Sequence, residues 1–250
     1  MRIPLYTLLL TLLCIGACGG EPDPEAIIRR AIDAHGGDHL DGKRITFDFR
    51  EYHYTIVLDG GWFQYERERP DSIGYLHDVL NNDGFYRHFD GRRVELPEER
   101  SAAYFSSLNS VAYFMLLPFK LEDRAVRTRY LSATEIRGEP YHEVEVTFAP
   151  EGGGRDYQDR FVYWFHRDEH TMDYLAYDYV TDETGTRFRE AFNAQTVGGL
   201  RFQDYYNYTS EEIVAPGDSI ERFDALFEAD RLDLVSTIEA NNLTVESIQR

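Results

Sequence analysis

The sequence contains very little cysteine and very little lysine. Only Cys14 and Cys18 are cysteines among 250 residues, and only Lys43 and Lys120 are lysines. With 45 acidic and 26 basic residues, the formal net charge is −19 at pH 7. A surface of this charge repels the phosphates of nucleic acids. We therefore expect no nucleic-acid partner.

Motifs of common catalytic and cofactor sites are also absent. The sequence has no Gly-x-Ser-x-Gly elbow, Walker loop, dinucleotide fingerprint or His-Glu-x-x-His motif. His166 and His170 are four residues apart but separate two strand-like runs, and this spacing suits a metal only on a helix. We predict no catalytic residue, no metal and no cofactor. A hydrolase with two buried carboxylates facing one another across a cleft stays a further possibility.

The first 17 residues have the layout of a secretory signal peptide. Arg2 precedes a short apolar run, and small residues precede Cys18. Ile15-Gly16-Ala17-Cys18 resembles the bacterial lipobox, which implies that Cys18 is acylated and begins the mature chain; an ordinary cleaved signal peptide is the alternative. The resemblance predicts a signal peptide at 1–17, a lipidated Cys18 with a tether at 18–23, and one domain at 24–250. In some bacteria, an aspartate directly after the acylated cysteine retains a lipoprotein at the inner membrane. Here that residue is Gly19, so we expect an outer-membrane lipoprotein of the cell envelope.

Two helices are expected in this domain. Asp23 can cap a helix that begins at Pro24 and ends at Gly36-Gly37. The second spans Glu98 to Leu117, is rich in aromatic residues and stops at Pro118.

The rest of the domain alternates apolar and polar residues with the period of strands. Residues 45–58 read as one long strand with a bulge, and the links after residue 125 are too short for parallel pairing. The patterns predict a mainly β, α+β fold with about 10–11 antiparallel strands. They form a strongly curved sheet or incomplete barrel that covers both helices. After residue 125 the expected strands are Val126–Ile136, Tyr141–Phe148, Asp159–His166, Met172–Val180, Thr186–Ala194, Leu200–Tyr208 and Ile220–Phe227.

Aromatic residues are abundant, with 18 tyrosines and 16 phenylalanines. Together they suit an apolar pocket for a lipid, an acyl chain or another hydrophobic molecule. The candidate pocket residues are Tyr104, Phe105, Leu108, Val111, Phe114, Met115, Phe119, Trp62 and Trp164. The alternative is a glycan- or protein-binding surface module in which exposed tyrosines and Trp62 or Trp164 form a stacking platform.

Several motifs occur in a familiar order. A helix ending Ala34-His35-Gly36-Gly37 precedes a strand beginning at Ile45, and the aromatic helix closes on Leu117-Pro118-Phe119. This order is similar to uncharacterised Gram-negative lipoproteins with an Ala-His-Gly-Gly helix end, which resemble the LolA/LolB-like lipoprotein-carrier fold. The resemblance implies an incomplete barrel around helices, an apolar cavity for acyl chains and no catalytic residues. An anchored chain resembles the membrane-bound receptor type of that fold.

Overall fold

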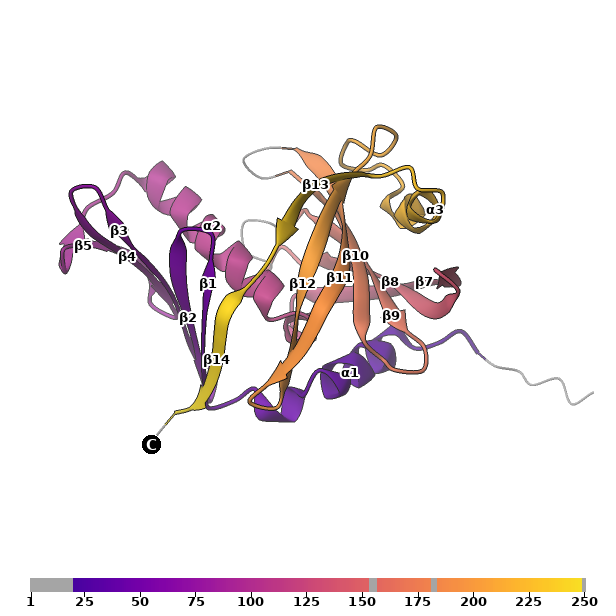
Figure 1. Cartoon of the computed structure of the whole chain (residues 1–250), viewed down its shortest axis with the longest axis horizontal. Helices are drawn as coiled ribbons and strands as arrows, with labels where there is room; N and C mark the ends of the chain where they lie inside the picture. The colour runs from indigo at the N-terminus through magenta and orange to yellow at the C-terminus, as the bar shows by residue number, and fades with distance from the viewer. Residues whose placement is uncertain (1–19, 153–156, 181–183, 249–250) are drawn as a thin grey trace, which may run out of the picture.

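Two seven-stranded antiparallel sheets contain most of the residues that the structure describes (Figure 1). The structure is a computed structural model that describes residues 20–152, 157–180 and 184–248. The expected signal peptide and Cys18 lie outside these residues. No helix in the described ranges is both long and apolar enough for a membrane span.

The strands follow one another in space almost as they do in sequence. In order across sheet A they are β14 (Asn241–Ser247), β1 (Lys43–Phe49), β2 (Tyr52–Asp59), β3 (Trp62–Asp71), β4 (Gly74–Asn81), β5 (Gly84–Phe89) and β6 (Arg92–Val94). In sheet B they are β13 (Asp233–Ile238), β12 (Leu200–Thr209), β11 (Gly185–Val197), β10 (Met172–Tyr179), β9 (Arg160–His166), β8 (Glu139–Phe148) and β7 (Val126–Ile136).

The last two strands connect the two sheets. β13 pairs with β12 at one edge of sheet B, and β14 pairs with β1 at one edge of sheet A. Only Glu239 and Ala240 separate them, so the chain steps directly from one sheet to the other (Figure 1). The sheets therefore form a strongly curved, open arrangement, as the sequence predicted, and not a closed barrel.

Two of the helices contribute to the core between the sheets. The helical segments are α1 (Pro24–Ala34), η1 (Gly37–His39), α2 (Glu98–Met115), η2 (Phe119–Glu122), η3 (Ile220–Arg222) and α3 (Phe223–Glu228). α2 packs on β3, β4 and β5, whereas α1 packs on η2, β7 and β9. In Figure 1, α2 runs across the gap between the two sheets. Apolar residues of α1, α2 and both sheets form one continuous inner core.

A second, smaller core lies on the other face of sheet B. There Trp164 and Phe188 pack with Phe223 and Phe227 of α3. Residues 161–166 of β9 are consequently all buried, with alternate side chains in the two cores. This explains why Phe161–Phe165 is an uninterrupted apolar run, since a strand buried on both faces loses its polar alternation.

The mainly β, α+β fold class is confirmed, but some elements differ from the predictions. The described residues contain 14 strands, more than the 10–11 expected. Residues 45–58 form a hairpin of β1 and β2, because Arg50 adopts a left-handed φ of 54° in a tight turn between them. Residues 220–227 are η3 and α3 instead of a strand. Their apolar residues recur at helical spacing and pack on sheet B.

Candidate ligand-binding pocket

A pocket of about 280 Å³ lies between α2 and the region where the two sheets part. Its walls come from α2, β1, β11, β12 and the β13–β14 connection. It is lined by Phe47, Phe49, Arg50, Ser107, Ser110, Val111, Phe114, Met115, Leu117, Arg189, Phe202, Gln203, Asp204, Tyr205, Ile238 and Ala240. Most of these side chains are apolar, and the polar ones come mainly from β11, β12 and the exposed side of α2.

A buried charge cluster anchors α2 to sheet A. Asp78 of β4 is fully buried and accepts hydrogen bonds from Arg67 Nε at 2.8 Å and Arg87 Nε at 2.6 Å. Arg67 also donates to the Ser107 hydroxyl of α2 at 2.8 Å, and the Arg87 guanidinium lies 3.5 Å from the Tyr104 ring centroid. Because both arginines contact α2 and are themselves fixed by Asp78, the helix is held firmly on this sheet.

Two other contacts attach the C-terminal half of α2 to sheet B. The hydroxyls of Tyr113 and Tyr163 are 2.9 Å apart, and burial raises the pKa of both, so both stay protonated. The Arg189 guanidinium of β11 lies 3.9 Å from the ring centroid of Phe114. The helix thus bridges the two sheets and forms one wall of the pocket.

His35 connects the end of α1 to the sheet that forms the pocket wall. It is 1% exposed, and its Nε2 accepts a hydrogen bond from the Met172 backbone N–H at 3.2 Å. Gln203 donates to the Met172 carbonyl at 2.6 Å and to the Tyr205 hydroxyl at 3.0 Å. Burial lowers the pKa of His35 to about 3, so the ring is neutral and acts as an acceptor. Burial also raises the pKa of Tyr205 to about 12.

The glycine after His35 is required by close packing. Gly36 has φ +87°, and a Cβ there would lie 2.0 Å from the carbonyl oxygen of Gly199 in the β11–β12 turn. Arg201 N–H donates to the His35 carbonyl at 2.9 Å beside this contact. The Ala34-His35-Gly36-Gly37 motif is therefore a docking element between α1 and sheet B.

Asp204 holds the connection between the sheets. It is 5% exposed and accepts hydrogen bonds from the Ala240 N–H at 2.9 Å and from Asn193 Nδ2 at 2.7 Å. The first bond fixes the short link between β13 and β14. The second fixes the irregular part of β11, where the register with β12 shifts.

The structure brings part of the predicted residue set to this pocket. Val111, Phe114 and Met115 line it. Leu108 is buried in the inner core, with Phe105 packed against that core, whereas Tyr104 faces Arg87.

The remaining predicted residues lie elsewhere. Phe119 packs edge-on against His35. Trp62 is 42% exposed at the start of β3, and Trp164 is fully buried beneath α3. Because Trp164 has no exposed face, it is not available for stacking on a glycan.

Sequence reasoning missed the contribution of β11 and β12. Arg189 alternates with Phe188 along β11, a pattern that normally places the charged residue in solvent. Here both faces of β11 are covered by other parts of the protein. Arg189 therefore lines the pocket on one face, and Phe188 packs in the second core on the other. Only the packing of the second core reveals this, and the local sequence carries no signal for it.

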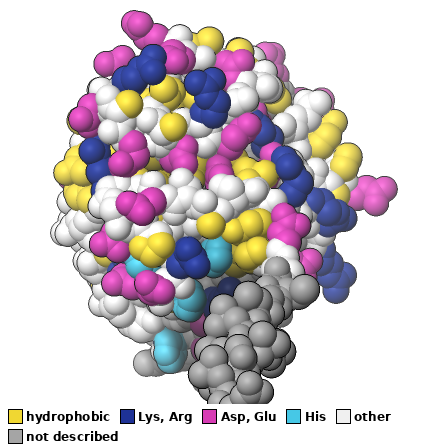
Figure 2. All heavy atoms as spheres, turned by 90° about the vertical axis from the view of Figure 1, so that its right-hand side faces the viewer, with side chains coloured by type: hydrophobic (Ala, Val, Ile, Leu, Met, Phe, Trp, Pro, Cys, Tyr) yellow, Lys and Arg dark blue, Asp and Glu magenta, His cyan; other side chains and the backbone are white. Residues whose placement is uncertain are grey.

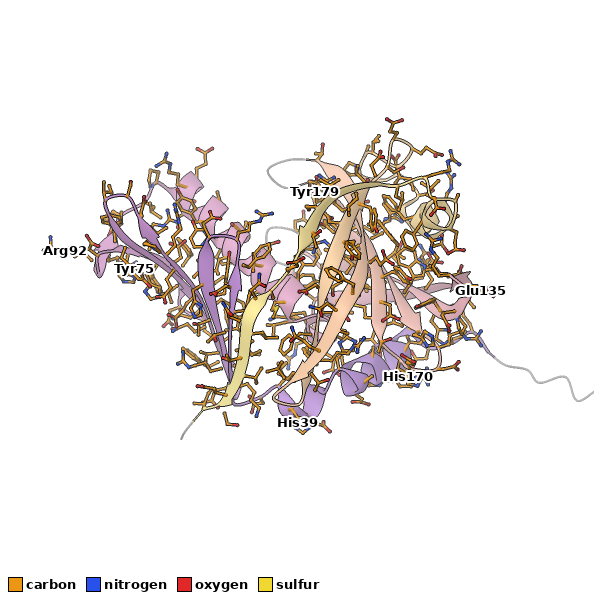
Figure 3. All side chains as sticks on the ribbon, in the orientation of Figure 1. His39, Tyr75, Arg92, Glu135, His170 and Tyr179 are labelled. Atoms are coloured by element: carbon orange, nitrogen blue, oxygen red, sulfur yellow. The ribbon has the colours of Figure 1, made fainter. Side chains whose placement is uncertain are left out.

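His166 and His170 do not assemble a metal site in the described ranges. No cluster of three His, Cys, Asp or Glu residues suited to a metal ion occurs among those residues. His166 Nδ1 accepts hydrogen bonds from the Asp168 and Glu169 backbone N–H groups, which stabilises a hairpin turn. His39 and His170 lie apart near α1 (Figure 3).

A buried acid lies on the opposite face of sheet B. Glu143 is 5% exposed and accepts a hydrogen bond from the Ser132 hydroxyl at 2.7 Å. Burial raises the pKa of Glu143 to about 7. Asp224 of α3 accepts from Thr134 at 3.0 Å. Neither acid lines the pocket described above.

A protein-family model matches nearly the whole chain. Residues 5–240 match the model of DUF6503, a family of unknown function. The chain belongs to the DUF6503 family. No curated protein matches this DUF6503 chain.

Solved structures similar to this DUF6503 protein come from several bacteria. One is a LolA superfamily protein from Nitrosomonas europaea, with TM-score 0.47, 10% identity, and 90% of this chain and 92% of that chain covered. Another is a DUF1329 family protein from Desulfovibrio piger, with TM-score 0.43, 10% identity, and 89% and 93% covered. The Mycobacterium tuberculosis lipoprotein LppX is similar at TM-score 0.28 and 11% identity, with 63% and 90% covered.

One face of the molecule carries its acidic side chains in a scattered pattern. On the face shown in Figure 2, acidic side chains are interspersed with arginines and small apolar areas. No broad basic area is visible there. On this face the acidic side chains are not gathered into one patch.

Proposed function

We propose that this protein is an outer-membrane-anchored lipoprotein of the cell envelope whose β-domain binds a hydrophobic molecule, a lipid or an acyl chain. Its role is binding, without a catalytic step. The supporting observation is the pocket beneath α2, whose apolar side chains come from both sheets and from the helix. Its volume lies near the lower end of the range of small-ligand sites, about 300–1,000 Å³.

The position of α2 supports access to this pocket. Ser107 and Ser110 lie on the exposed side of the helix and also line the pocket, so its mouth is beside α2. A ligand can therefore enter along the helix while Asp78 and its arginines hold the helix on sheet A.

The test is mass spectrometry of organic extracts from protein purified without denaturation. We expect a copurified lipid or fatty acid in stoichiometric amount. Ser110→Trp fills the mouth of the pocket and should abolish copurification. Ala103→Trp is the matched control, because Ala103 is also exposed on α2 but does not line the pocket. Extracts without any lipid, together with no binding of added amphiphiles, contradict the proposal.

A further inference from the structure

One side chain of the pocket has an unbalanced charge. Arg189 is 8% exposed, and its Nη2 donates to the Tyr177 hydroxyl at 2.8 Å. Its guanidinium carbon lies 3.9 Å from the Phe114 ring centroid and 5.2 Å from that of Tyr177. Its buried Nε has no hydrogen-bond partner. Within the described ranges, no carboxylate forms an ion pair with it.

A buried guanidinium normally has an anionic partner, because removing a charge from water is costly. The other buried arginine among the described residues follows that rule: Arg67 pairs with Asp78, as does the partly buried Arg87 beside it. Arg189 instead has two aromatic rings and one neutral hydroxyl. Aromatic faces attract a cation, but they do not neutralise it.

The other charges of the pocket do not supply this anion. Asp204 is occupied by the Ala240 N–H and by Asn193. Arg50 is exposed at the pocket and adds a second positive charge. Two arginines and one aspartate give the lining a formal charge of +1, in a chain whose formal charge is −19. The pocket is thus locally favourable for an anion that the rest of the surface repels.

The remainder of the lining suits an apolar chain. Val111, Met115 and Leu117 form the helix side, and Phe47, Phe202 and Ile238 form the sheet side. A ligand that satisfies both parts has one charged end and one apolar tail.

We infer that the pocket binds a single-chain amphiphile with an anionic head, a carboxylate or a phosphate, paired with Arg189. The tail lies between α2 and the two sheets. This inference rests on the proposed function and narrows its ligand class.

The first experiment compares three amphiphiles with similar acyl chains on the unmodified protein. Isothermal titration calorimetry measures the affinity for oleate, for oleoyl lysophosphatidate and for oleyl alcohol, which has no charge. We expect at least one anionic amphiphile to bind tenfold or more tightly than oleyl alcohol. The tighter of the two anions identifies the head as carboxylate or phosphate.

The second experiment assigns the preference to Arg189. In Arg189→Gln, the affinity for the preferred anionic amphiphile should fall close to the affinity for oleyl alcohol, which should still bind. Arg189→Lys keeps the charge and should keep most of the preference, which provides a readout if the glutamine variant folds poorly. Arg187→Gln is the matched control, since Arg187 lies two residues earlier on β11 and outside the lining. Circular dichroism verifies the folding of each variant.

The outcomes separate this inference from the proposed function. Equal affinities for all three amphiphiles, or an unchanged preference in folded Arg189→Gln, overturn the role of Arg189 while hydrophobic binding stands. Absence of binding for every amphiphile, together with lipid-free extracts, overturns the proposed function itself.

Discussion

At the residue scale, two buried titratable groups couple the stability of this protein to pH in opposite directions. His35 is held neutral at the end of α1, and Glu143 is held partly protonated beneath α3. Both effects come from burial, which disfavours the charged form of either group. The two pH ranges overlap between 4.5 and 6.5, so each contribution is measured by substituting its own residue.

His35 makes the protein less stable as the solution becomes acidic. Its pKa is about 3 in the folded protein and 6.5 as an ordinary histidine, so only the unfolded chain gains a proton below pH 6.5. At pH 5 this difference lowers the free energy of unfolding by about 2 kcal/mol. We expect His35→Gln to lose less stability than the unmodified protein between pH 7 and pH 5 in urea denaturation. The exposed His39→Gln variant should follow the unmodified protein.

Glu143 has the reverse effect. Its pKa of about 7 lies above the ordinary 4.5, so the folded state is penalised as pH rises from 4.5 through 7. Glu143→Gln keeps an acceptor for Ser132 and should be about 3 kcal/mol more stable than the unmodified protein at pH 8. At pH 4.5 the difference should nearly vanish. Glu145→Gln, which removes ion pairs with Arg129 and Arg160, should not stabilise the protein.

At the element scale, α1 and α2 are attached by different physical means. α1 docks by close backbone packing at Gly36, whereas α2 is fixed by buried charge at Asp78. The first attachment depends on the absence of a side chain and the second on the presence of one.

Comparing Gly36→Ala with Gly42→Ala separates two contributions to stability at the end of α1: the strain of a left-handed backbone and the close packing on Gly199. An alanine in a left-handed backbone conformation lowers the free energy of unfolding by about 1–2 kcal/mol. Gly42 has a similar φ of +70° with nothing within 4 Å, so Gly42→Ala measures this backbone cost alone. Gly36→Ala adds a clash with the Gly199 carbonyl and should destabilise the protein further. Equal losses in urea denaturation would show that the close approach contributes nothing.

Asp78→Asn tests the attachment of α2. The change leaves Arg67 and Arg87 buried without a carboxylate and should cost about 3–5 kcal/mol. Amide hydrogen exchange should increase most in residues 98–115, because both arginines contact α2. Asp83→Asn, in the exposed β4–β5 turn, is the control and should leave the exchange rates unchanged.

At the scale of the whole molecule, the chain passes from sheet B to sheet A between β13 and β14. Asp204 fixes this step, and α2 crosses the gap on the other side of the pocket. The molecule therefore combines a strongly acidic exterior with a small apolar interior that carries one extra positive charge.

The proposed anchor makes a prediction at the same scale. Buried acyl chains contribute about 0.8 kcal/mol per methylene, so an acylated Cys18 keeps the protein on the membrane. In cells that process lipoproteins, Cys18→Ser should move the protein from the membrane pellet to the soluble fraction. Cys14→Ser should leave it in the pellet, since Cys14 lies within the expected signal peptide. Recovery of the Cys18→Ser protein in the pellet, with no acyl label on unmodified Cys18, contradicts the anchor.

The sequence by itself determined the elements whose signals are local. Asp23 caps α1 by accepting from the Glu25 N–H, Gly36 ends that helix, and the period-2 patterns identified most strands. These features depend on neighbours a few residues apart, so one sequence suffices to read them. The same patterns led to the mainly β fold and to Val111, Phe114 and Met115 of the pocket wall.

Only the tertiary structure decided which faces of sheet B are covered and where the sheets part. Trp164, predicted for the pocket or a stacking platform, lies in the second core, and Arg189, which the sequence did not single out, lines the pocket. Both placements have one reason: α3 and α2 cover opposite faces of the same strands. Burial on both faces depends on contacts between residues far apart in the chain. Alternation along a single strand therefore cannot reveal that a buried arginine lies in the pocket, and this arginine now defines the ligand we expect.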